Sequence, residues 1–509
     1  MVALRVCPAF LFLLAAFAGV AADHYVTPPG GYGTNNPPYT NWADAATNIQ
    51  WAVNVATNGE TVWVTNGDYS LTNQIVITNQ VLVRSLNGYG NTVILGNGAN
   101  RCFFMTNRAS ISGLTITNGF AASNDYWGRG GGIMAYGTCG VYNCLITGNR
   151  SDTTNRYEGG GGMYINRSAV TGCIVRGNVS SLDAGGINAE YSCLISGCVI
   201  DANIASNRGG GMRVAANTVC AGNQIVSNKA YLYYPTDTYY GGGGALNSGG
   251  FVMFTNCVFD GNWTAYQGGG IYFMQSPGMV IDCVFSNNRA VSIAGSSGLG
   301  GALSLYGAAS GCIVTALNCQ IVNNYSAVGG GISVGAGGYA LNCLFKGNRA
   351  LNGGAVRMYG IQNYGGYIGS CTIVSNYGTN SSGAIYIEGT NNNNSVYNCA
   401  AWGNNSTNTA WPVFYDTVAP TNANALWYTC ANYTNFPAGQ GNITNDPQFV
   451  DFAGGNYRLN ASSPCVNAGT NQSWMTNAFD LDGRMRIRYG IVDMGAYENI
   501  REGALYHVW

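Results

Sequence analysis

Two pairs of opposite charges have the spacing that acid–base chemistry needs. Glu190 with Arg213, and Arg357 with Glu388, lie on consecutive copies of a repeat that begins with a run of glycines. Such a pair could supply a base and a charge clamp for a lyase that cleaves uronic-acid polysaccharides. The same spacing also permits two plain ion pairs between neighbouring copies. Both interpretations stay open from the sequence.

Tyrosines accompany these charges in the same repeat. After the glycines, apolar residues alternate with variable ones, as in GGGMYIN and SGAIYIE. Aromatic faces among Asn, Arg and Glu suit sugar rings, which present apolar C–H faces and a belt of hydroxyls. Cross-strand tyrosine packing would give the same pattern. The candidate glycan-binding residues are Tyr136, Tyr164, Tyr272, Tyr306, Tyr359 and Tyr386.

A second possible acid pair is formed by Asp201 and Asp260, which share a repeat position two copies apart. Their separation of roughly 9 to 10 Å is at the edge of the range for an inverting glycosidase. Arg176, one copy before Asp201, favours an ion pair instead. We therefore predict a binding protein without an evident catalytic constellation, with a polysaccharide lyase or glycoside hydrolase as the alternative.

Acidic residues near the C-terminus could bind Ca²⁺ through hard oxygen ligands. The candidates are Asp480, Asp482 and Asp493, but no complete calcium-loop spacing is present. The alternative pairs these carboxylates with nearby arginines such as Arg458 and Arg484. We predict no metal and no cofactor, with Ca²⁺ as the alternative. Zinc is disfavoured because no CxxC pair exists.

A Cys followed five residues later by an Asn marks the element that positions these side chains. Copies are 24 to 36 residues apart, yet the five-residue step is constant. We interpret the cysteines as an inward ladder of small side chains and the asparagines as an amide ladder at a turn that needs a left-handed residue. Stacked disulfides are the alternative for the cysteines. The ladders comprise Cys144, Cys173, Cys198, Cys257, Cys283, Cys319, Cys343, Cys371 and Cys399, and Asn149, Asn178, Asn203, Asn228, Asn262, Asn288, Asn324, Asn348, Asn376 and Asn404.

Units of two or three short strands cannot bury their own apolar face, so they must stack. A right-handed parallel β-helix of about a dozen coils meets this need, with coils about 4.8 Å apart. The fold class is therefore all-β. We expect the repeats to begin with Gly113 in the Cys position and Asn118 in the Asn position. A short helix after Asn41, ending at Gly59, should cover the open end.

Composition restricts the possible partners. Charged residues make up only 8% of the chain, and 21 basic residues balance 22 acidic ones, so we predict no nucleic-acid partner. The N-terminus has Arg5 before an apolar run and small residues up to Ala22, as in a secretory signal. We expect a secreted or cell-surface protein, a monomer, whose partner is a polysaccharide or cell-surface glycan.

Two resemblances extend this prediction. The GG repeats with FDGN, FSNN and FKGN resemble those of chlamydial polymorphic outer-membrane proteins, which implies an adhesin. The stretch from Asp446 to Glu498, with DPQFVD, YRL, DLDGR and DMGAYE, resembles a choice-of-anchor Q domain, which implies a bacterial surface protein with a pectin-lyase-like β-helix. The expected domains are a signal peptide (1–22), N-terminal cap and first coils (23–112), β-helix repeats (113–406), an irregular coil (407–444) and the choice-of-anchor Q-like cap (445–509).

Overall fold

The computed structural model describes residues 22–122, 128–155, 158–231, 241–291, 298–306, 312–360, 365–388, 393–407, 413–417, 425–433, 436, 439–488 and 490–499. Residues 1–21 of the expected signal peptide lie outside these ranges, so that peptide stays a prediction. Within the described ranges, no helix is long and apolar enough to cross a membrane.

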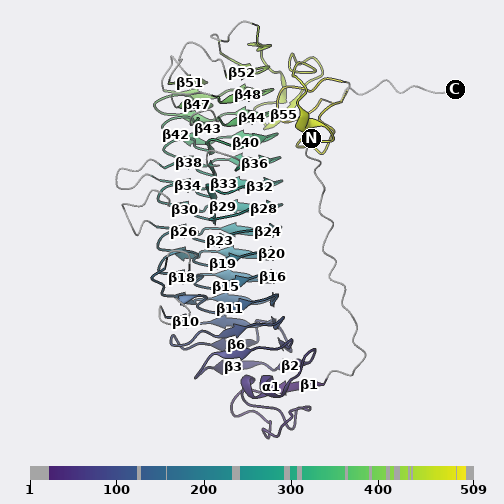
Figure 1. The fold of residues 1–509 in the computed structure, drawn as a ribbon. Coiled ribbons are helices and arrows are strands. Elements are labelled where there is room, and N and C mark those ends of the chain that lie inside the picture. The colour runs from purple at the N-terminus through teal and green to yellow at the C-terminus, as the bar shows by residue number, and fades with distance from the viewer. Residues whose placement is uncertain are drawn as a thin grey trace, which may run out of the picture.

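The chain winds into a rod of stacked coils (Figure 1). Each complete coil contributes one strand to each of four parallel sheets, in the order sheet C, sheet A, sheet B and sheet D, and each strand pairs with its counterpart one coil later. The predicted right-handed parallel β-helix is confirmed. Each coil has four strands and not the predicted two or three, because the two residues after each ladder Asn form a short strand of their own.

The strand bounds follow the sheets. Sheet A contains β1 (Asp23–Val26), β2 (Thr61–Val64), β5 (Leu82–Ser85), β8 (Ser110–Ser112), β12 (Gly140–Tyr142), β16 (Ala169–Thr171), β20 (Leu194–Ser196), β24 (Thr218–Ala221), β28 (Val252–Thr255), β32 (Gly278–Ile281), β36 (Val314–Leu317), β40 (Gly338–Leu341), β44 (Tyr367–Gly369), β48 (Ser395–Tyr397) and β52 (Leu426–Trp427). Sheet B contains β3 (Gly67–Ser70), β6 (Thr92–Leu95), β9 (Thr115–Thr117), β13 (Leu145–Thr147), β17 (Ile174–Arg176), β21 (Val199–Asp201), β25 (Gln224–Val226), β29 (Val258–Asp260), β33 (Val284–Ser286), β37 (Gln320–Val322), β41 (Leu344–Lys346), β45 (Thr372–Val374), β49 (Ala400–Trp402) and β53 (Cys430–Ala431).

Sheets C and D contain fewer strands than sheets A and B, and each strand of sheet D has only two residues. Sheet C contains β4 (Ile75–Ile77), β7 (Phe103–Met105), β11 (Ile133–Tyr136), β15 (Met163–Asn166), β19 (Ile187–Glu190), β23 (Met212–Val214), β27 (Ala245–Asn247), β31 (Ile271–Met274), β35 (Leu303–Tyr306), β39 (Ile332–Val334), β43 (Val356–Tyr359), β47 (Ile385–Glu388) and β51 (Phe414–Asp416). Sheet D contains β10 (Phe120–Ala121), β14 (Arg150–Ser151), β18 (Val179–Ser180), β22 (Ile204–Ala205), β26 (Lys229–Ala230), β30 (Trp263–Thr264), β34 (Arg289–Ala290), β38 (Tyr325–Ser326), β42 (Arg349–Ala350), β46 (Tyr377–Gly378) and β50 (Asn405–Ser406).

A short helix covers the N-terminal end of the core. Helix α1 (Ile49–Val55) buries Ile49, Ala52 and Val53, as the prediction of a capping helix required. Its N-cap is Asn48, whose side chain accepts from the N–H of Gln50 at 2.8 Å, and not the expected Asn41. Asn41 lies in the preceding loop and bonds to Asp44 instead.

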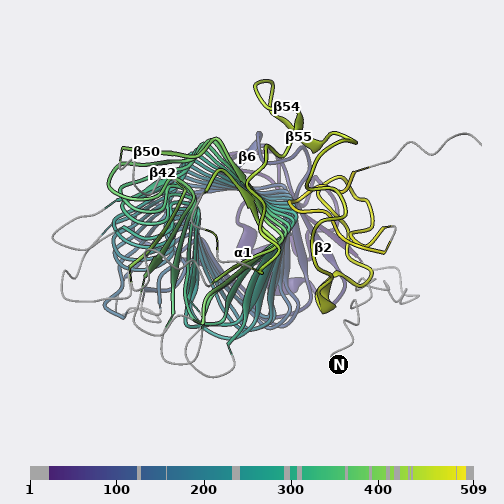
Figure 2. The ribbon, with the colours of Figure 1, turned by 90° about the horizontal axis from the view of Figure 1, so that it is seen from above.

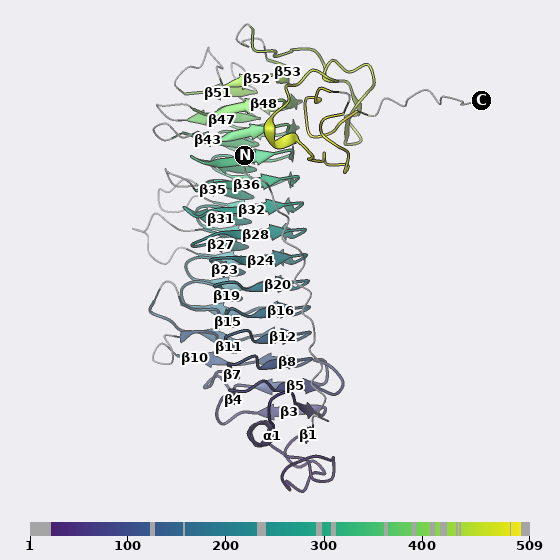
Figure 3. The same ribbon diagram turned by 45° about the vertical axis from the view of Figure 1, so that its right-hand side comes forward.

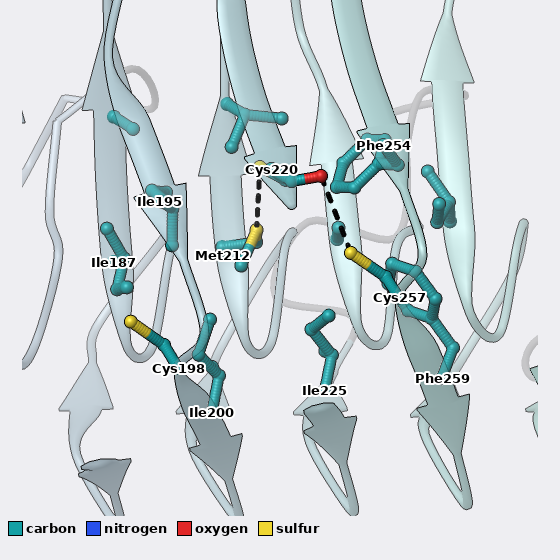
Figure 4. Packing of buried hydrophobic residues seen from close by; sticks show 14 of the residues in the cluster. Ile187, Ile195, Cys198, Ile200, Met212, Cys220, Ile225, Phe254, Cys257 and Phe259 are labelled. Atoms are coloured by element: carbon teal, nitrogen blue, oxygen red, sulfur yellow. Dashed lines mark hydrogen bonds between the residues drawn. The ribbon is translucent and has the colours of Figure 1, made fainter. Parts of the chain in front are cut away.

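The core is a continuous apolar column inside the sheets (Figure 4). Alternate residues of sheets A, B and C point inward, for example Ile195, Ile200 and Ile187 within one coil. Aromatic residues fill the middle coils, where the Phe259 and Phe285 rings stack at 4.8 Å. Because the coils share this core, the outward residues of each sheet must also form columns along the rod axis.

The ladder asparagines lie in one buried column at the corner between sheets B and D. The Asn348 Oδ1 atom accepts from the Asn324 backbone N–H at 2.9 Å, and Asn348 Nδ2 donates to Asn376 Oδ1 at 2.9 Å. The left-handed residue of the turn stands one position earlier than expected, at Gly347 with φ of 65° for instance. The ladder asparagine follows this left-handed residue, and its side chain is buried inside the turn.

The ladder cysteines lie in a second column at the corner between sheets A and B. The Cys144 backbone N–H donates to Cys173 Sγ at 3.4 Å. The thiol sulfur of one coil therefore accepts a hydrogen bond from the backbone of the neighbouring coil. All cysteines in the described ranges are free, which excludes the disulfide interpretation for them. The first coil of the repeats is shifted by one residue from our expectation, because Leu145 pairs with Thr115. Leu114 therefore takes the Cys position and Gly119 the Asn position, in place of Gly113 and Asn118.

The C-terminal segment lies beside the upper coils (Figures 2 and 3). It contains the antiparallel pair β54 (Phe449–Asp451) and β55 (Asn456–Leu459) and the 3-10 helix η2 (Ser473–Met475). Its contacts come from ladder corners, where Asn398 Nδ2 donates to the Thr470 carbonyl at 2.8 Å. This segment therefore braces the side of the rod.

Candidate functional site

The outer face of sheet C carries all ten predicted glycan-binding and catalytic residues. Their side chains alternate along the strands with the inward core residues, as expected for strand periodicity. Described residues of the segments between sheets D and C lie against this face, as Arg129 does with its guanidinium 4.8 Å from the centre of the Tyr164 ring, and several of the outward residues are buried. Tyr164 and Tyr272 are each only 1% exposed. Function at this face would therefore be confined to places where these segments leave an opening.

One opening is a pocket of about 350 Å³ over strands β31, β35, β39 and β43. It brings together the predicted residues Tyr272, Tyr306, Tyr359 and Arg357, which come from three different strands. Amides and hydroxyls complete its wall. The remaining lining residues are Gln267, Gln275, Leu299, Ser304, Ser333 and Gly335.

The polar groups of this pocket are held in place by one another. Arg357 Nη1 donates to Ser333 Oγ at 3.1 Å, and the Arg357 guanidinium lies 4.8 Å from the centre of the Tyr359 ring. Gly335 makes room for Tyr306, since a Cβ at this glycine would lie 2.6 Å from the Tyr306 ring. The pocket thus offers aromatic edges beside fixed hydrogen-bond donors and acceptors.

The other predicted tyrosines lie elsewhere on the same face. The rings of Tyr136 and Tyr164 are 5.4 Å apart, near the N-terminal third of the rod. Tyr386 stacks on Tyr415 with ring centres 5.8 Å apart and planes 2° apart. These three residues are therefore occupied with aromatic neighbours, as the cross-strand packing interpretation expects.

The four weak catalytic candidates form ion pairs. Arg213 Nη1 lies 2.8 Å from Glu190 Oε1, and Arg357 Nε lies 2.8 Å from Glu388 Oε2. Glu190 also accepts from the Tyr164 hydroxyl at 2.6 Å. Burial and the Glu190 carboxylate raise the pKa of Tyr164 far above its ordinary value, so this phenol keeps its proton and is unsuited to be a general base.

A buried charged network next to these residues was not predicted. Asp183 and Arg208 form an ion pair at 2.8 Å, with side chains 0% and 3% exposed. Asn207 Nδ2 also donates to Asp183 at 2.8 Å. Further toward the N-terminus, Arg129 pairs with Glu158. Arg129 also donates to the Tyr136 hydroxyl at 2.5 Å, so this residue ties the segment before β11 to the tyrosines, and the Asp183–Arg208 pair joins two neighbouring segments.

The sequence did contain a signal for this network. Arg129, Asp183 and Arg208 each stand four residues before the first residue of the sheet C strand in their repeat, and Glu158 stands five residues before it. Three charges at one repeat position, with a fourth beside it, are conspicuous in a chain with only 8% charged residues. Aligning the residues before the glycines, as well as those after them, would have found the network.

The aspartates considered for an inverting glycosidase lie on sheet B. Asp201 pairs with Arg176 at 2.8 Å, as the ion-pair interpretation expected. Asp260 accepts from Ser286 Oγ at 2.5 Å and Asn287 Nδ2 at 2.8 Å. Both carboxylates are bound to protein partners.

The three calcium candidates bind groups of the protein. Asp480 Oδ1 accepts the N–H groups of Asp482 and Arg484 at 2.9 and 2.7 Å. Asp482 pairs with Arg458, and Asp493 accepts from the Asn467 N–H at 2.7 Å. No cluster of three or more His, Cys, Asp or Glu side chains suited to a metal occurs among the described residues. Calcium binding by Asp480, Asp482 and Asp493 stays a prediction that these contacts do not support.

Glu498 should make the stability of the C-terminal segment depend on pH. Burial raises the pKa of Glu498 from 4.5 to about 8. The folded protein therefore keeps a proton that the unfolded chain loses between these pH values, so stability falls as pH rises toward 8, by at most about 1.4 kcal/mol per pH unit. Glu498→Gln should flatten the dependence in thermal melts from pH 5 to 9. Glu388→Gln, at a partly exposed glutamate, serves as control, and equal curves for Glu498→Gln and the parent chain would contradict this prediction.

The chain was compared with family models, curated proteins and solved structures, and only solved structures resemble it. No family model matches the chain, and no curated protein matches it. Similar solved structures include pectate lyase Pel9A (12% identity, TM-score 0.33, 95% of this chain and 97% of that one). Others are a mannuronic acid-specific family 6 polysaccharide lyase from human gut microbiota (12%, TM-score 0.37, 84% and 92%) and the catalytic domain of a GH87 α-1,3-glucanase in complex with tetrasaccharides (12%, TM-score 0.32, 81% and 69%). With identities and TM-scores this low, no argument about function rests on them.

Proposed function

We propose that the protein is an exported, adhesin-like rod that binds a polysaccharide or cell-surface glycan along the outer face of sheet C. The observation that carries this proposal is the pocket in which Tyr272, Tyr306, Tyr359 and Arg357 meet. Aromatic rings beside amide, hydroxyl and guanidinium groups provide both kinds of contact that a sugar offers. A column of equivalent positions along the rod suits a long ligand.

Binding accounts for the arrangement better than catalysis does. The arginines and glutamates of the face neutralise one another in ion pairs, and Tyr164 holds its proton. A binding surface tolerates such pairs, whereas a general base needs a pKa near the working pH. Export and surface location rest on the N-terminal sequence and on the resemblance of the C-terminal segment.

Removing the pocket tyrosines should weaken glycan binding. We expect Tyr306→Ala and Tyr359→Ala each to reduce affinity about tenfold, because each removes an aromatic contact with the sugar. The measurement is titration calorimetry with the best ligand from a panel of neutral and acidic polysaccharides. Tyr142→Ala, on the outer face of sheet A, is the matched control. Unchanged affinity in both pocket variants would refute this site.

A polysaccharide lyase or glycoside hydrolase remains a second candidate. It is favoured by one observation, the contact of Glu190 with both Arg213 and Tyr164. Reducing-end and unsaturated-uronate assays on the same panel would test it. Activity that Arg213→Ala abolishes would replace the binding proposal, whereas a panel without turnover would leave binding as the function.

A further inference from the structure

A second surface runs along sheet D, at the left edge of the rod in Figure 1. The first residue of each sheet D strand points outward, and over six consecutive coils these residues alternate between cationic and aromatic. Strand pairing places each directly beside the next. We call this column the sheet D stripe: Lys229, Trp263, Arg289, Tyr325, Arg349 and Tyr377.

The aromatic residues of the stripe hold the cations. The Arg289 guanidinium lies 5.3 Å from the centre of the Tyr325 ring, and that of Arg349 lies 5.1 Å from the centre of the Tyr377 ring. Such contacts stabilise an exposed guanidinium in one place while its N–H groups stay available. The stripe therefore presents ordered positive charges in a row.

These cations have no acidic partner among the described residues. Lys229, Arg289 and Arg349 are exposed, and none of them makes an ion pair within the ranges that the structure describes. The acid closest in sequence to Trp263 is Asp260, whose carboxylate is bound to Ser286 and Asn287. Three exposed cations without an acidic partner in the described part of the chain therefore lie in one column, which makes the row a candidate site for an anionic ligand.

The spacing of the charges identifies the ligand class. Cations recur every second coil, roughly 9 to 10 Å apart. That distance is close to the length of two sugar units in an extended polysaccharide. We infer that the sheet D stripe binds an acidic polysaccharide that carries a carboxylate or sulfate on every second sugar. The stripe is separate from the sheet C pocket, and this inference does not depend on the function proposed for that pocket.

A nucleic acid fits the stripe less well. Single-stranded nucleic acids bind proteins largely by stacking bases on free aromatic faces. Here Arg289 and Arg349 each lie over a face of Tyr325 and Tyr377, and the Trp263 ring lies 5.2 Å from the tilted Tyr231 ring. The two tyrosines of the stripe therefore hold its arginines, and Trp263 packs against Tyr231.

Affinity electrophoresis of the full chain in gels with hyaluronan, which has one carboxylate per disaccharide, tests the inference. We expect retardation that weakens as salt is raised, and none in gels with neutral hydroxyethylcellulose. The Arg289→Ala/Arg349→Ala variant should bind about tenfold more weakly, the size expected for losing two exposed charge contacts. The Arg289→Lys/Arg349→Lys variant should keep part of the binding.

Arg150→Ala is the matched control, because Arg150 is an exposed sheet D arginine outside the stripe. It should bind like the parent chain, as should the pocket variant Tyr306→Ala, which separates the two surfaces. Melting temperatures confirm that each variant is folded. The inference is overturned if hyaluronan is not bound, if Arg150→Ala weakens binding as much as the stripe variant, or if oligo-dT is bound more tightly than hyaluronan.

Discussion

Replacing Asp183 by alanine should destabilise the β-helix by about 3–5 kcal/mol, the cost of leaving a buried charge without its partner. Arg208 is 3% exposed on its side chain and donates to both Asp183 oxygens, so the variant would strand a guanidinium away from water. The free energy of unfolding from chemical denaturation measures the loss. The segment between sheets D and C should loosen first, because this pair clamps it.

Asp201→Ala is the matched control for this prediction. It breaks an ion pair with the same shortest distance, 2.8 Å to Arg176, in which the arginine is 55% exposed. Loss of that pair should cost less than about 1 kcal/mol. The double variant Asp183→Ala/Arg208→Ala should recover part of the loss, since it removes the stranded charge. Equal costs for Asp183→Ala and Asp201→Ala would show that the buried pair has no special role.

Periodicity made the β-helix predictable, because coil geometry repeats in the sequence. The constant step from Cys to Asn fixed the two corners of sheet B, and the alternation after the glycines gave the outward side of sheet C. Aligning the residues that follow the ladder asparagines would have revealed the sheet D stripe as well. Its members directly follow the ladder asparagines, as in SNK at Lys229 and NNR at Arg289.

Features without a repeat could not be predicted in this way. The C-terminal segment docks through contacts distant in sequence, such as Asn342 Nδ2 to the Phe479 carbonyl at 3.0 Å. The burial of Tyr164 and Tyr272 depends on the segments that cover sheet C, and these segments vary in length from coil to coil. The outward tyrosines therefore fall into two groups: the pocket gathers three of them, and the others pack against neighbours.

Asn394 shows the same limit on a single residue. Its place in a run of four asparagines predicts a loop side chain with no structural partner. In the structure, Asn394 is 3% exposed and its Oδ1 accepts from the Gly366 N–H at 2.7 Å. A low-complexity run therefore does not identify a dispensable residue, and a control for the asparagine ladder has to be chosen elsewhere.

Asn348→Ala should destabilise the rod by at least about 2 kcal/mol. The side chain accepts from the Asn324 N–H and Nδ2 groups at 2.9 and 3.0 Å, and donates to the Ile321 carbonyl at 2.8 Å and Asn376 Oδ1 at 2.9 Å. Alanine would leave the Asn324 N–H and the Ile321 carbonyl buried without these partners. An unsatisfied buried group costs about 1–3 kcal/mol. The ladder is buried, so water does not readily replace the lost hydrogen bonds.

Asn73→Ala is the control for this variant, since Asn73 is exposed in a bend before β4 and is not a member of the asparagine ladder. Its substitution should change the free energy of unfolding by less than about 0.5 kcal/mol. A ladder bonded in both directions also predicts that damage spreads to the coils of Asn324 and Asn376. Hydrogen exchange should therefore quicken at those two coils in Asn348→Ala, and a loss confined to the Asn348 coil would mean that the rungs are independent.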